Sequence, residues 1–536
     1  MNGKIRKNIP AAAVFGIIFV ILTGLFHGLD VSASVEQSGH GFLMSGYVLL
    51  FLLLTVFLVF AGFLLFKSSV RPERSFFVTG LFLGLFFMAV MPGISAPDEI
   101  SHYITAYRLS DRMMGLPELD ETGHHIQIRP EDNILENMDS VQDTSSGSKK
   151  NVLGDPVSEE TYRSVCEWDS TYGLTRGSGN SDQADVRTTP LVYIPQAVGI
   201  TVARVLNLNS LWLLFLGKLM NLLVYLFLTS LAIRKAPFGK ELIFGTGLLP
   251  MTLHLSSSMS YDTMILGASF LLISWILNLA YETKKVEVRD MAVLCILIAV
   301  MGPCKMVYSL LLFLFFLIPE NKFGSRKKKM LSFAAMACSL VLAMALVNAS
   351  VIRSYAAADT GAGVVVQNTK AGYTVAELLH RPVFVLEMLC RTAVYQGEQL
   401  HLSMIGEWLG NLDPVMGIPY FLSVAFSLGL LALAFRKPEE KKIMTGKAKI
   451  WCGLIILGIV LLTAGAMFIS WTGRDSLVIE GLQGRYFLPM LPLFLILLKN
   501  DRIVLTKDTN RNILFGFVCM DAYALLRLYA TACLRL

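Results

Sequence analysis

A short polar segment, PDEISH at residues 97–102, follows a long apolar run and brings two carboxylates and an imidazole close together. A carboxylate in this position can accept a proton from a hydroxyl group, which makes Asp98 a candidate general base. Glu99 and His102 would orient Asp98 or bind a divalent metal, although so few ligands do not define a metal site. The structural alternative is that Pro97 begins a helix and that the carboxylates in its first turn are favoured by the helix dipole.

Two further charged residues lie where apolar segments are interrupted. Asp262 follows the serine-rich sequence SSSMSY, and it either caps the next helix or faces the same cavity as Asp98. Lys305 ends the sequence MGPCK, which breaks an apolar run that is too long for one membrane span. A buried ammonium group needs an anionic partner such as a lipid phosphate, whereas a lysine near a helix end also snorkels to the membrane surface.

Arg485 and Tyr486 belong to the sequence GRYFLP, where a predicted span enters the membrane. The planar guanidinium group suits a pair of phosphate oxygens, so we interpret Arg485 as a substrate-binding residue. The alternative is an interfacial anchor, a role that Tyr486 would share. Lys218 and His254 are expected to satisfy buried hydrogen bonds inside the helix bundle.

The composition indicates a polytopic helical membrane protein. Of the 536 residues, 54% are hydrophobic and only 16% are charged. Repeated apolar runs approach or exceed the roughly 20 residues that cross a bilayer as a helix. Only Cys166 of the eight cysteines lies in a long polar loop, so no disulfide framework is indicated. The basic clusters fit membrane-topology determinants and not a nucleic-acid site.

Thirteen transmembrane helices are expected from the apolar runs. Their approximate positions are 10–27, 43–66, 75–93, 211–233, 241–258, 262–281, 290–304, 306–319, 330–352, 415–435, 450–471, 484–498 and 512–532. The segment 188–206 is also apolar, but counting it as a crossing would invert every later loop. We therefore predict an interfacial or re-entrant helix there.

The distribution of basic residues orients these spans. More than half of the 46 Lys and Arg residues lie in the loops that would face the cytoplasm. This bias places the N-terminus inside and the C-terminus outside the cell membrane. Residues 94–190 then form a large first outer loop.

The spans divide the chain into four regions. Residues 1–74 hold two added N-terminal transmembrane helices, and residues 75–352 form the core with its outer loop. Residues 353–414 form a second outer segment with juxtamembrane helices. Residues 415–536 contain the C-terminal transmembrane helices.

The motifs resemble those of the GT-C glycosyltransferases. The first large loop of that class has similar features. In this sequence they are the end of an apolar span, the P-D-E sequence, the nearby aromatic Tyr103 and a long outer loop. The closest resemblance is to an uncharacterised bacterial branch of multi-pass proteins of unknown function with a P-D-E-x-x-H motif. Its features appear in order as PDEISH, SMSYD, GPCKMVY, EWLGNLD and QGRYFLPMLP.

The resemblance implies an all-α, GT-C-like fold and an inverting transfer of a hexose or pentose. The donor would be a polyprenyl-phosphate-linked sugar, and the acceptor would be a hydroxyl of a cell-envelope polysaccharide, another glycan, a lipid or a protein. Asp98 and Glu99 take the catalytic positions, while His102, Tyr103, Asp262, Lys305, Arg485 and Tyr486 take substrate-binding positions. No D-x-D pair is evident in the first loop, so a divalent metal cofactor stays open.

Two other functions use the same residues. A transporter or flippase for lipid-linked saccharides would use the intramembrane charges as a substrate path. Such proteins often contain paired broken helices in inverted repeats, and a second copy of the break near Lys305 is not evident. A non-catalytic scaffold for polymer assembly would use its outer loops to bind partners.

Overall fold

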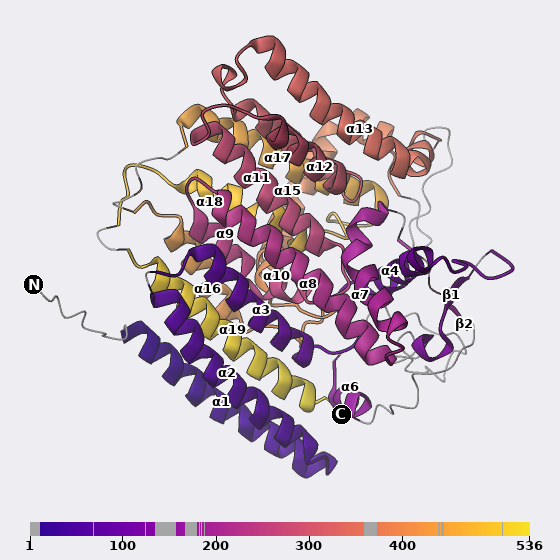
Figure 1. Ribbon diagram of the computed structural model, residues 1–536, viewed down its shortest axis with the longest axis vertical. Helices are drawn as coiled ribbons and strands as arrows, with labels where there is room; N and C mark the ends of the chain where they lie inside the picture. Colours follow the sequence, from indigo (N-terminus) through magenta and orange to yellow (C-terminus); the bar gives the residue numbers. More distant parts are fainter. Residues whose placement is uncertain are drawn as a thin grey trace, which may run out of the picture.

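The computed structural model is a helical protein with one small sheet outside the main helical body (Figure 1). It describes residues 11–67, 69–123, 125–133, 157–166, 179–181, 183, 185–186, 188–357, 372–437, 440, 444–505 and 508–535. Much of the predicted outer loop 94–190 and residues 358–371 of the segment 353–414, with the sequence DTGAG, lie outside the described residues.

The α-helices follow one another through the whole chain. In order they are α1 (Ala11–Ser38), α2 (Phe42–Phe66), α3 (Pro72–Val90), α4 (Glu99–Met114), α6 (Glu159–Cys166), α7 (Ile194–Val205), α8 (Ser210–Lys235), α9 (Lys240–Gly247), α10 (Pro250–Ser256), α11 (Asp262–Tyr281), α12 (Val288–Met301), α13 (Arg326–Ala357), α14 (Val375–His380), α15 (Pro382–Ile405), α16 (Tyr420–Leu433), α17 (Gly446–Ser470), α18 (Leu491–Leu498) and α19 (Asn510–Cys533).

Short 3-10 helices and two strands complete the secondary structure of the described residues. They are η1 (Pro130–Asn133), η3 (Pro190–Tyr193), η4 (Met306–Leu317), η5 (Glu320–Phe323), η7 (Gly484–Met490), β1 (Ile126–Ile128) and β2 (Gly179–Ser181). The strands are antiparallel, with Ile126 opposite Ser181.

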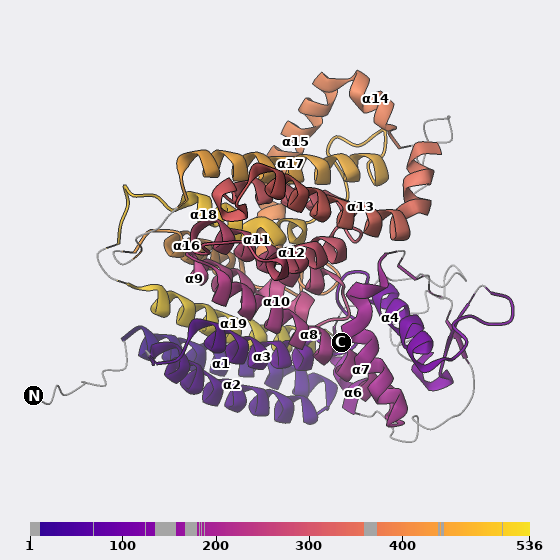
Figure 2. The same cartoon turned by 45° about the horizontal axis from the view of Figure 1, so that its top comes forward.

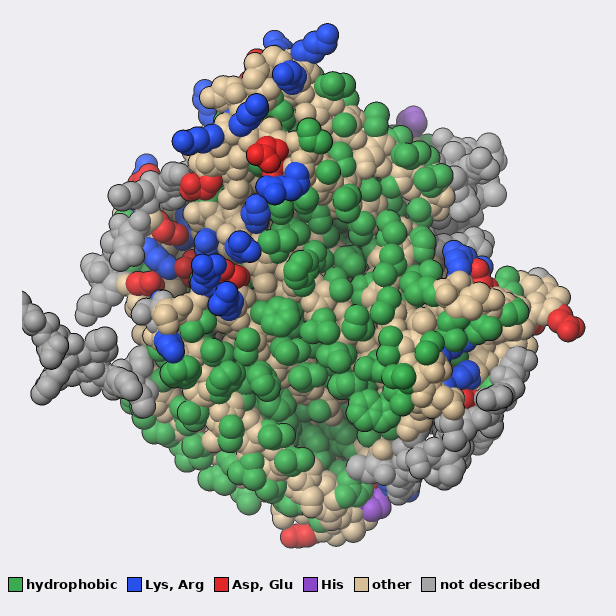
Figure 3. Space-filling view, viewed as in Figure 1, with side chains coloured by type: hydrophobic (Ala, Val, Ile, Leu, Met, Phe, Trp, Pro, Cys, Tyr) green, Lys and Arg blue, Asp and Glu red, His purple; other side chains and the backbone are tan. Residues whose placement is uncertain are grey.

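Eight of the described helices are long and apolar enough to cross a membrane, namely α1, α2, α3, α8, α11, α13, α17 and α19. This supports a membrane protein built from α-helices. The other predicted spans coincide with shorter or interrupted elements: α9 with α10, α12, η4, α16, and η7 with α18. A broad face of hydrophobic side chains covers the middle of the molecule, with charged groups gathered beside it (Figure 3).

Two of these interruptions contain a proline, Pro250 in one and Pro303 in the other. Pro250 occupies the first position of α10, so the chain leaves α9 and starts a new helix there. The segment 302–305 separates α12 from η4, which confirms the predicted break at GPCK. Non-helical backbone of this kind is tolerated at membrane depth only against protein or a water-filled cavity.

The segment predicted as an interfacial or re-entrant helix forms η3 and α7. These elements cover Pro190–Val205, about 26 Å of helix at most. This is shorter than the roughly 30 Å hydrocarbon core of a bilayer. The helix packs against α4 and α8 (Figures 1 and 2).

The first two helices pack along the last one, at one side of the bundle (Figures 1 and 2). The Ser34 hydroxyl donates to the Cys533 carbonyl at 2.6 Å, and the Tyr529 hydroxyl donates to the Leu43 carbonyl at 3.0 Å. These buried hydrogen bonds join segments from opposite ends of the sequence.

Candidate functional site

The polar segment after α3 forms a tight turn that aims Asp98 away from its own helix. Asp98 has φ 58° and ψ 16°, a left-handed conformation, and is the residue before α4. Its side chain makes no capping hydrogen bond. The expectation that Pro97 begins the helix and that Asp98 lies in its first turn is therefore wrong. The turn at residues 96–98 ends with Asp98 in the left-handed region, so the helix starts at Glu99.

Glu99 lies beneath this turn and is fully buried. Its two carboxylate oxygens accept hydrogen bonds from the backbone N–H groups of Ala96 and Met259, each at 2.8 Å. The Lys218 ammonium group lies 3.2 Å from Glu99 Oε1 and donates to the Gly93 carbonyl. Glu99 therefore fixes the turn that carries Asp98, and its burial separates it from solvent.

Asp98, Asp262, Lys305 and Arg485 form one charged cluster, which we call the four-charge cluster. The Lys305 ammonium donates to Asp262 Oδ1 at 2.6 Å. One terminal nitrogen of Arg485 lies 3.4 Å from Asp262, and the other lies 3.4 Å from Asp98. Two cations and two carboxylates from four separate segments thus meet at one place.

Exposure falls steeply across the four-charge cluster. The Asp98 side chain is 54% exposed, that of Lys305 21%, that of Asp262 10% and that of Arg485 4%. Asp98 is therefore the carboxylate that a soluble or membrane-bound reactant would reach first. Asp262 is nearly buried and contacts both cations.

Aromatic rings and an amide position the cations. The Lys305 ammonium lies 4.5 Å from the centre of the Tyr486 ring and 5.5 Å from that of Tyr261. The Arg485 Nε donates to Gln483 Oε1 at 2.6 Å. The Tyr308 hydroxyl donates to the Tyr486 carbonyl at 2.7 Å, which joins η4 to η7.

His102 lies behind the cluster as an uncharged group. Its Nδ1 is 2.7 Å from the Tyr193 hydroxyl, and its ring packs edge-on against Tyr261. Burial lowers the pKa of His102 to about 4, while the nearby carboxylates of Asp262 and Asp98 oppose this effect. The imidazole is therefore neutral at pH 7.

Tyr103 lies apart from the four-charge cluster. Its side chain is fully buried in an apolar layer formed by α4, α7 and α8. Its ring packs against Tyr107 at 5.9 Å. The predicted contact of Tyr103 with substrate would require this layer to open.

A candidate metal centre is absent from the described ranges. No group of three or more His, Cys, Asp and Glu residues there has the arrangement to hold a metal ion. Asp98 and Asp262 each face Arg485. Their oxygens are thus directed at a cation that the chain itself provides.

Several residues of the site were not expected from the sequence. Gln483, Tyr193 and Tyr261 position Arg485 and His102, and Lys218 pairs with Glu99. Lys218 was expected only to satisfy buried hydrogen bonds. A single lysine in the middle of an apolar helix is a signal for such a role, because an isolated charge there is costly.

The segment EWLGNLD, residues 407–413, lies beside the site through backbone packing. Gly410 has φ 63° and approaches the Ser95 carbonyl. Asp413 forms an ion pair with Arg535 at 2.9 Å. This segment therefore supports the turn before Asp98.

Comparisons with known proteins identify a family but no characterised relative. No curated protein and no solved structure matches the chain. One family model, described as a predicted membrane protein (DUF2142), matches residues 81–494 and so includes every member of the four-charge cluster. Since this match covers well over half of the sequence, the chain belongs to the DUF2142 family of predicted membrane proteins.

Proposed function

We propose that this protein is a membrane glycosyltransferase of the GT-C type. It would move a sugar from a polyprenyl-phosphate donor to an acceptor hydroxyl on the outer face of the cell membrane. The observation that supports this best is the contact of Arg485 with both Asp98 and Asp262. An exposed carboxylate stands next to a buried guanidinium group and a partly exposed ammonium group, which is an arrangement that suits a base and a leaving phosphate.

The proposed reaction is a single inverting displacement. Asp98 takes the proton of the acceptor hydroxyl as its oxygen bonds to the anomeric carbon of the sugar. The bond between that carbon and the donor phosphate oxygen breaks, and the electron pair leaves with the phosphate. Lys305 and Arg485 stabilise the negative charge that grows on this phosphate.

Arg485 would also link donor binding to the activation of the base. Without donor, its guanidinium group is shared between the two carboxylates. A bound phosphate would draw Arg485 away from Asp98, and the loss of a neighbouring cation makes a carboxylate a better proton acceptor. Glu99 would hold the turn that carries Asp98, and His102 would position Tyr261.

The left-handed backbone of Asp98 also fits this proposal. Residues held at positive φ cost of order 1–3 kcal/mol and cluster at active sites. Asp98 is one of three non-glycine residues with positive φ within the described part of the chain. Its conformation turns the carboxylate toward Arg485, which an ordinary helix cap would not do.

The test is a transfer assay with purified full-length protein in bilayers and a panel of polyprenyl-phosphate sugars. Wild-type protein should transfer label to an acceptor, and Asp98→Asn should lose transfer while inserting and folding normally. Asp120→Asn is the matched control, because Asp120 lies in an exposed turn and bonds Thr122. Transfer by Asp98→Asn at the wild-type rate would overturn the assignment of the base. Movement of intact lipid-linked sugar across the bilayer without transfer would favour the transporter instead.

A further inference from the structure

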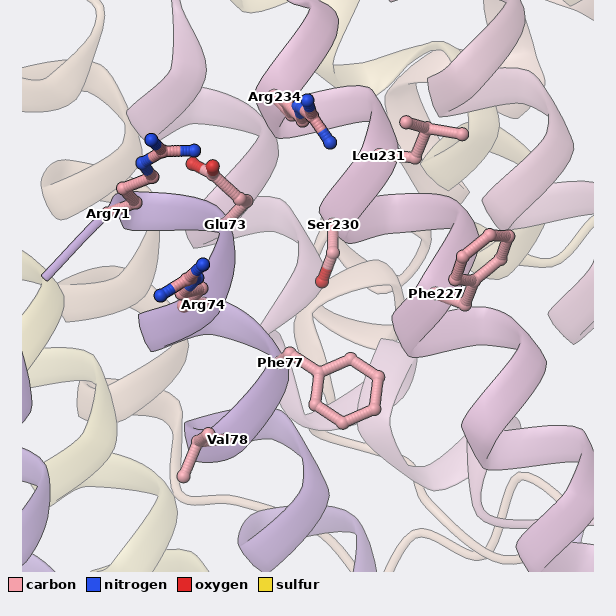
Figure 4. A pocket seen from close by; sticks show the side chains of 9 residues that line it. All are labelled: Arg71, Glu73, Arg74, Phe77, Val78, Phe227, Ser230, Leu231 and Arg234. Atoms are coloured by element: carbon pink, nitrogen blue, oxygen red, sulfur yellow. The ribbon is translucent and has the colours of Figure 1, made fainter.

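A second candidate site lies at the far end of α3 from the four-charge cluster. The N-terminal turn of α3 and the C-terminal turns of α8 line an open cavity of about 410 Å³ (Figure 4). The helix between this cavity and the turn of Asp98 has 19 residues, a length of about 28 Å. The cavity is thus separate from the proposed active site.

Three arginines surround the mouth of the cavity. Arg71 and Arg74 come from the start of α3, and Arg234 comes from the last turn of α8 (Figure 4). Within the described residues, none of their side chains forms an ion pair or a hydrogen bond. Glu73 is the one carboxylate in the lining, so the cavity carries a net positive charge.

A hydroxyl group and a helix end add to this preference for an anion. The Ser230 oxygen is buried, lines the cavity and has no hydrogen-bond partner in the part of the chain that the structure describes. The N-terminus of α3 directs the positive end of its helix dipole to the same side. A buried hydroxyl is expected to have a partner, and a bound ligand oxygen would supply it.

The inner wall of the cavity is apolar. Phe77 and Val78 of α3 and Phe227 and Leu231 of α8 line it, and Phe77 projects into the space between the two helices (Figure 4). The Phe227 side chain is 60% exposed, on a helix that is apolar and long enough to cross a membrane. A free phosphate ion gains nothing from such a wall, whereas an acyl chain buries apolar surface against it.

We propose that this cavity binds an anionic phospholipid. Its phosphate would lie between Arg71, Arg74 and Arg234, with the Ser230 hydroxyl as a further donor. One acyl chain would run along Phe77 and Phe227. Basic pockets between transmembrane helices recognise lipid headgroups in this way. The expected orientation of the chain places the site in the cytoplasmic leaflet. It does not depend on the proposed transferase activity.

The test measures lipid retained by purified full-length protein after gel filtration in detergent. Protein is incubated with phosphatidylglycerol, phosphatidylcholine or inorganic phosphate, and bound lipid is quantified by mass spectrometry. Wild-type protein should retain phosphatidylglycerol in preference to phosphatidylcholine, and excess inorganic phosphate should not displace it. The triple variant Arg71→Gln/Arg74→Gln/Arg234→Gln should retain about one tenth of the phosphatidylglycerol that the wild type retains, or less.

A matched control removes the same charge elsewhere. Arg326, Lys327 and Lys328 are exposed at the start of α13, and their triple replacement by Gln should leave retention unchanged. Phe227→Ala should weaken phosphatidylglycerol retention without lowering stability, since this side chain is exposed. Equal retention of phosphatidylcholine, equal loss in the control triple, or displacement by inorganic phosphate would each overturn the proposal.

Discussion

The Lys218 ammonium group lies 3.2 Å from the Glu99 carboxylate in a part of the protein that is almost closed to solvent. Lys218 comes from α8 and Glu99 from the start of α4. The two residues are 4% and 0% exposed. This pair joins the transmembrane bundle to the turn that carries Asp98.

Replacing Lys218 with Met should strongly destabilise the protein. The Glu99 carboxylate would stay buried without its cation, and breaking a buried pair in this way costs about 3–5 kcal/mol. Thermal unfolding in detergent would measure the loss. The double variant Lys218→Met/Glu99→Gln should recover part of it, because no charge is then left unpaired. If Lys218→Met were as stable as the wild type, a structural role for the Lys218–Glu99 pair would be contradicted.

Replacing Arg485 with Gln or with Lys should show whether the transfer rate depends on the positive charge of this residue or on the planar shape of its guanidinium group. In the proposed reaction, Arg485→Gln should lower kcat by about 10²–10³ because it removes a donor from the leaving phosphate. Arg485→Lys keeps the charge but loses the planar group that spans Gln483, Asp98 and Asp262, so it should recover only a fraction of the rate.

The same transfer assay, with kcat and KM measured separately, checks this prediction. Arg381→Gln is a suitable control, since Arg381 is exposed outside the cluster at the start of α15. Wild-type kcat in Arg485→Gln would exclude this residue from stabilising the transition state.

Stability should fall as the pH decreases through the range set by His102. The folded-state pKa is about 4, below the ordinary value near 6.5, because the imidazole is buried. Between these values the unfolded chain binds a proton that the folded protein does not. His102 therefore has no effect on the pH dependence of the free energy of unfolding above pH 6.5. It lowers this free energy by about 3 kcal/mol near pH 4.

Thermal unfolding from pH 7 to pH 4 would reveal this dependence. His102→Asn removes the titrating group while an amide can still bond Tyr193. Its melting temperature should change less with pH than that of the wild type. An identical pH profile for both proteins would show that another group dominates.

Asp521 offers a test of a different kind. It is fully buried in α19, and neither carboxyl oxygen has a hydrogen-bond partner within the described residues. Replacement by Val, which is apolar and only slightly larger than Asp, should stabilise the protein by about 1–3 kcal/mol because an unsatisfied polar group is removed. A lower melting temperature for Asp521→Val in detergent would point to a role for this carboxyl group.

The sequence predicted the helical membrane fold and the break near Lys305, because both depend on local patterns. It also selected Asp98, Asp262, Lys305 and Arg485, which lie together in the structure, while their roles stay predictions. The left-handed turn at Asp98 was not predictable in this way. It depends on Glu99 reaching Met259 and Lys218, which are more than 100 residues away in the sequence.

The number of membrane-spanning helices also depends on contacts between residues that lie far apart in the sequence. Apolar content alone does not distinguish a full crossing from the paired short elements α9 and α10 or η7 and α18. Their ends are held by neighbours such as Tyr308, which bonds the backbone of η7. Pattern recognition finds the apolar runs, and tertiary partners decide where each run is interrupted.

The packing of α1 and α2 against α19 has a consequence for biosynthesis. Ser34 and Cys533 are 499 positions apart, yet one hydrogen bond joins them in the interior. The partner that α1 and α2 pack against is therefore translated almost 500 residues after them. A nascent chain that stops before α19 would leave these two helices without this support.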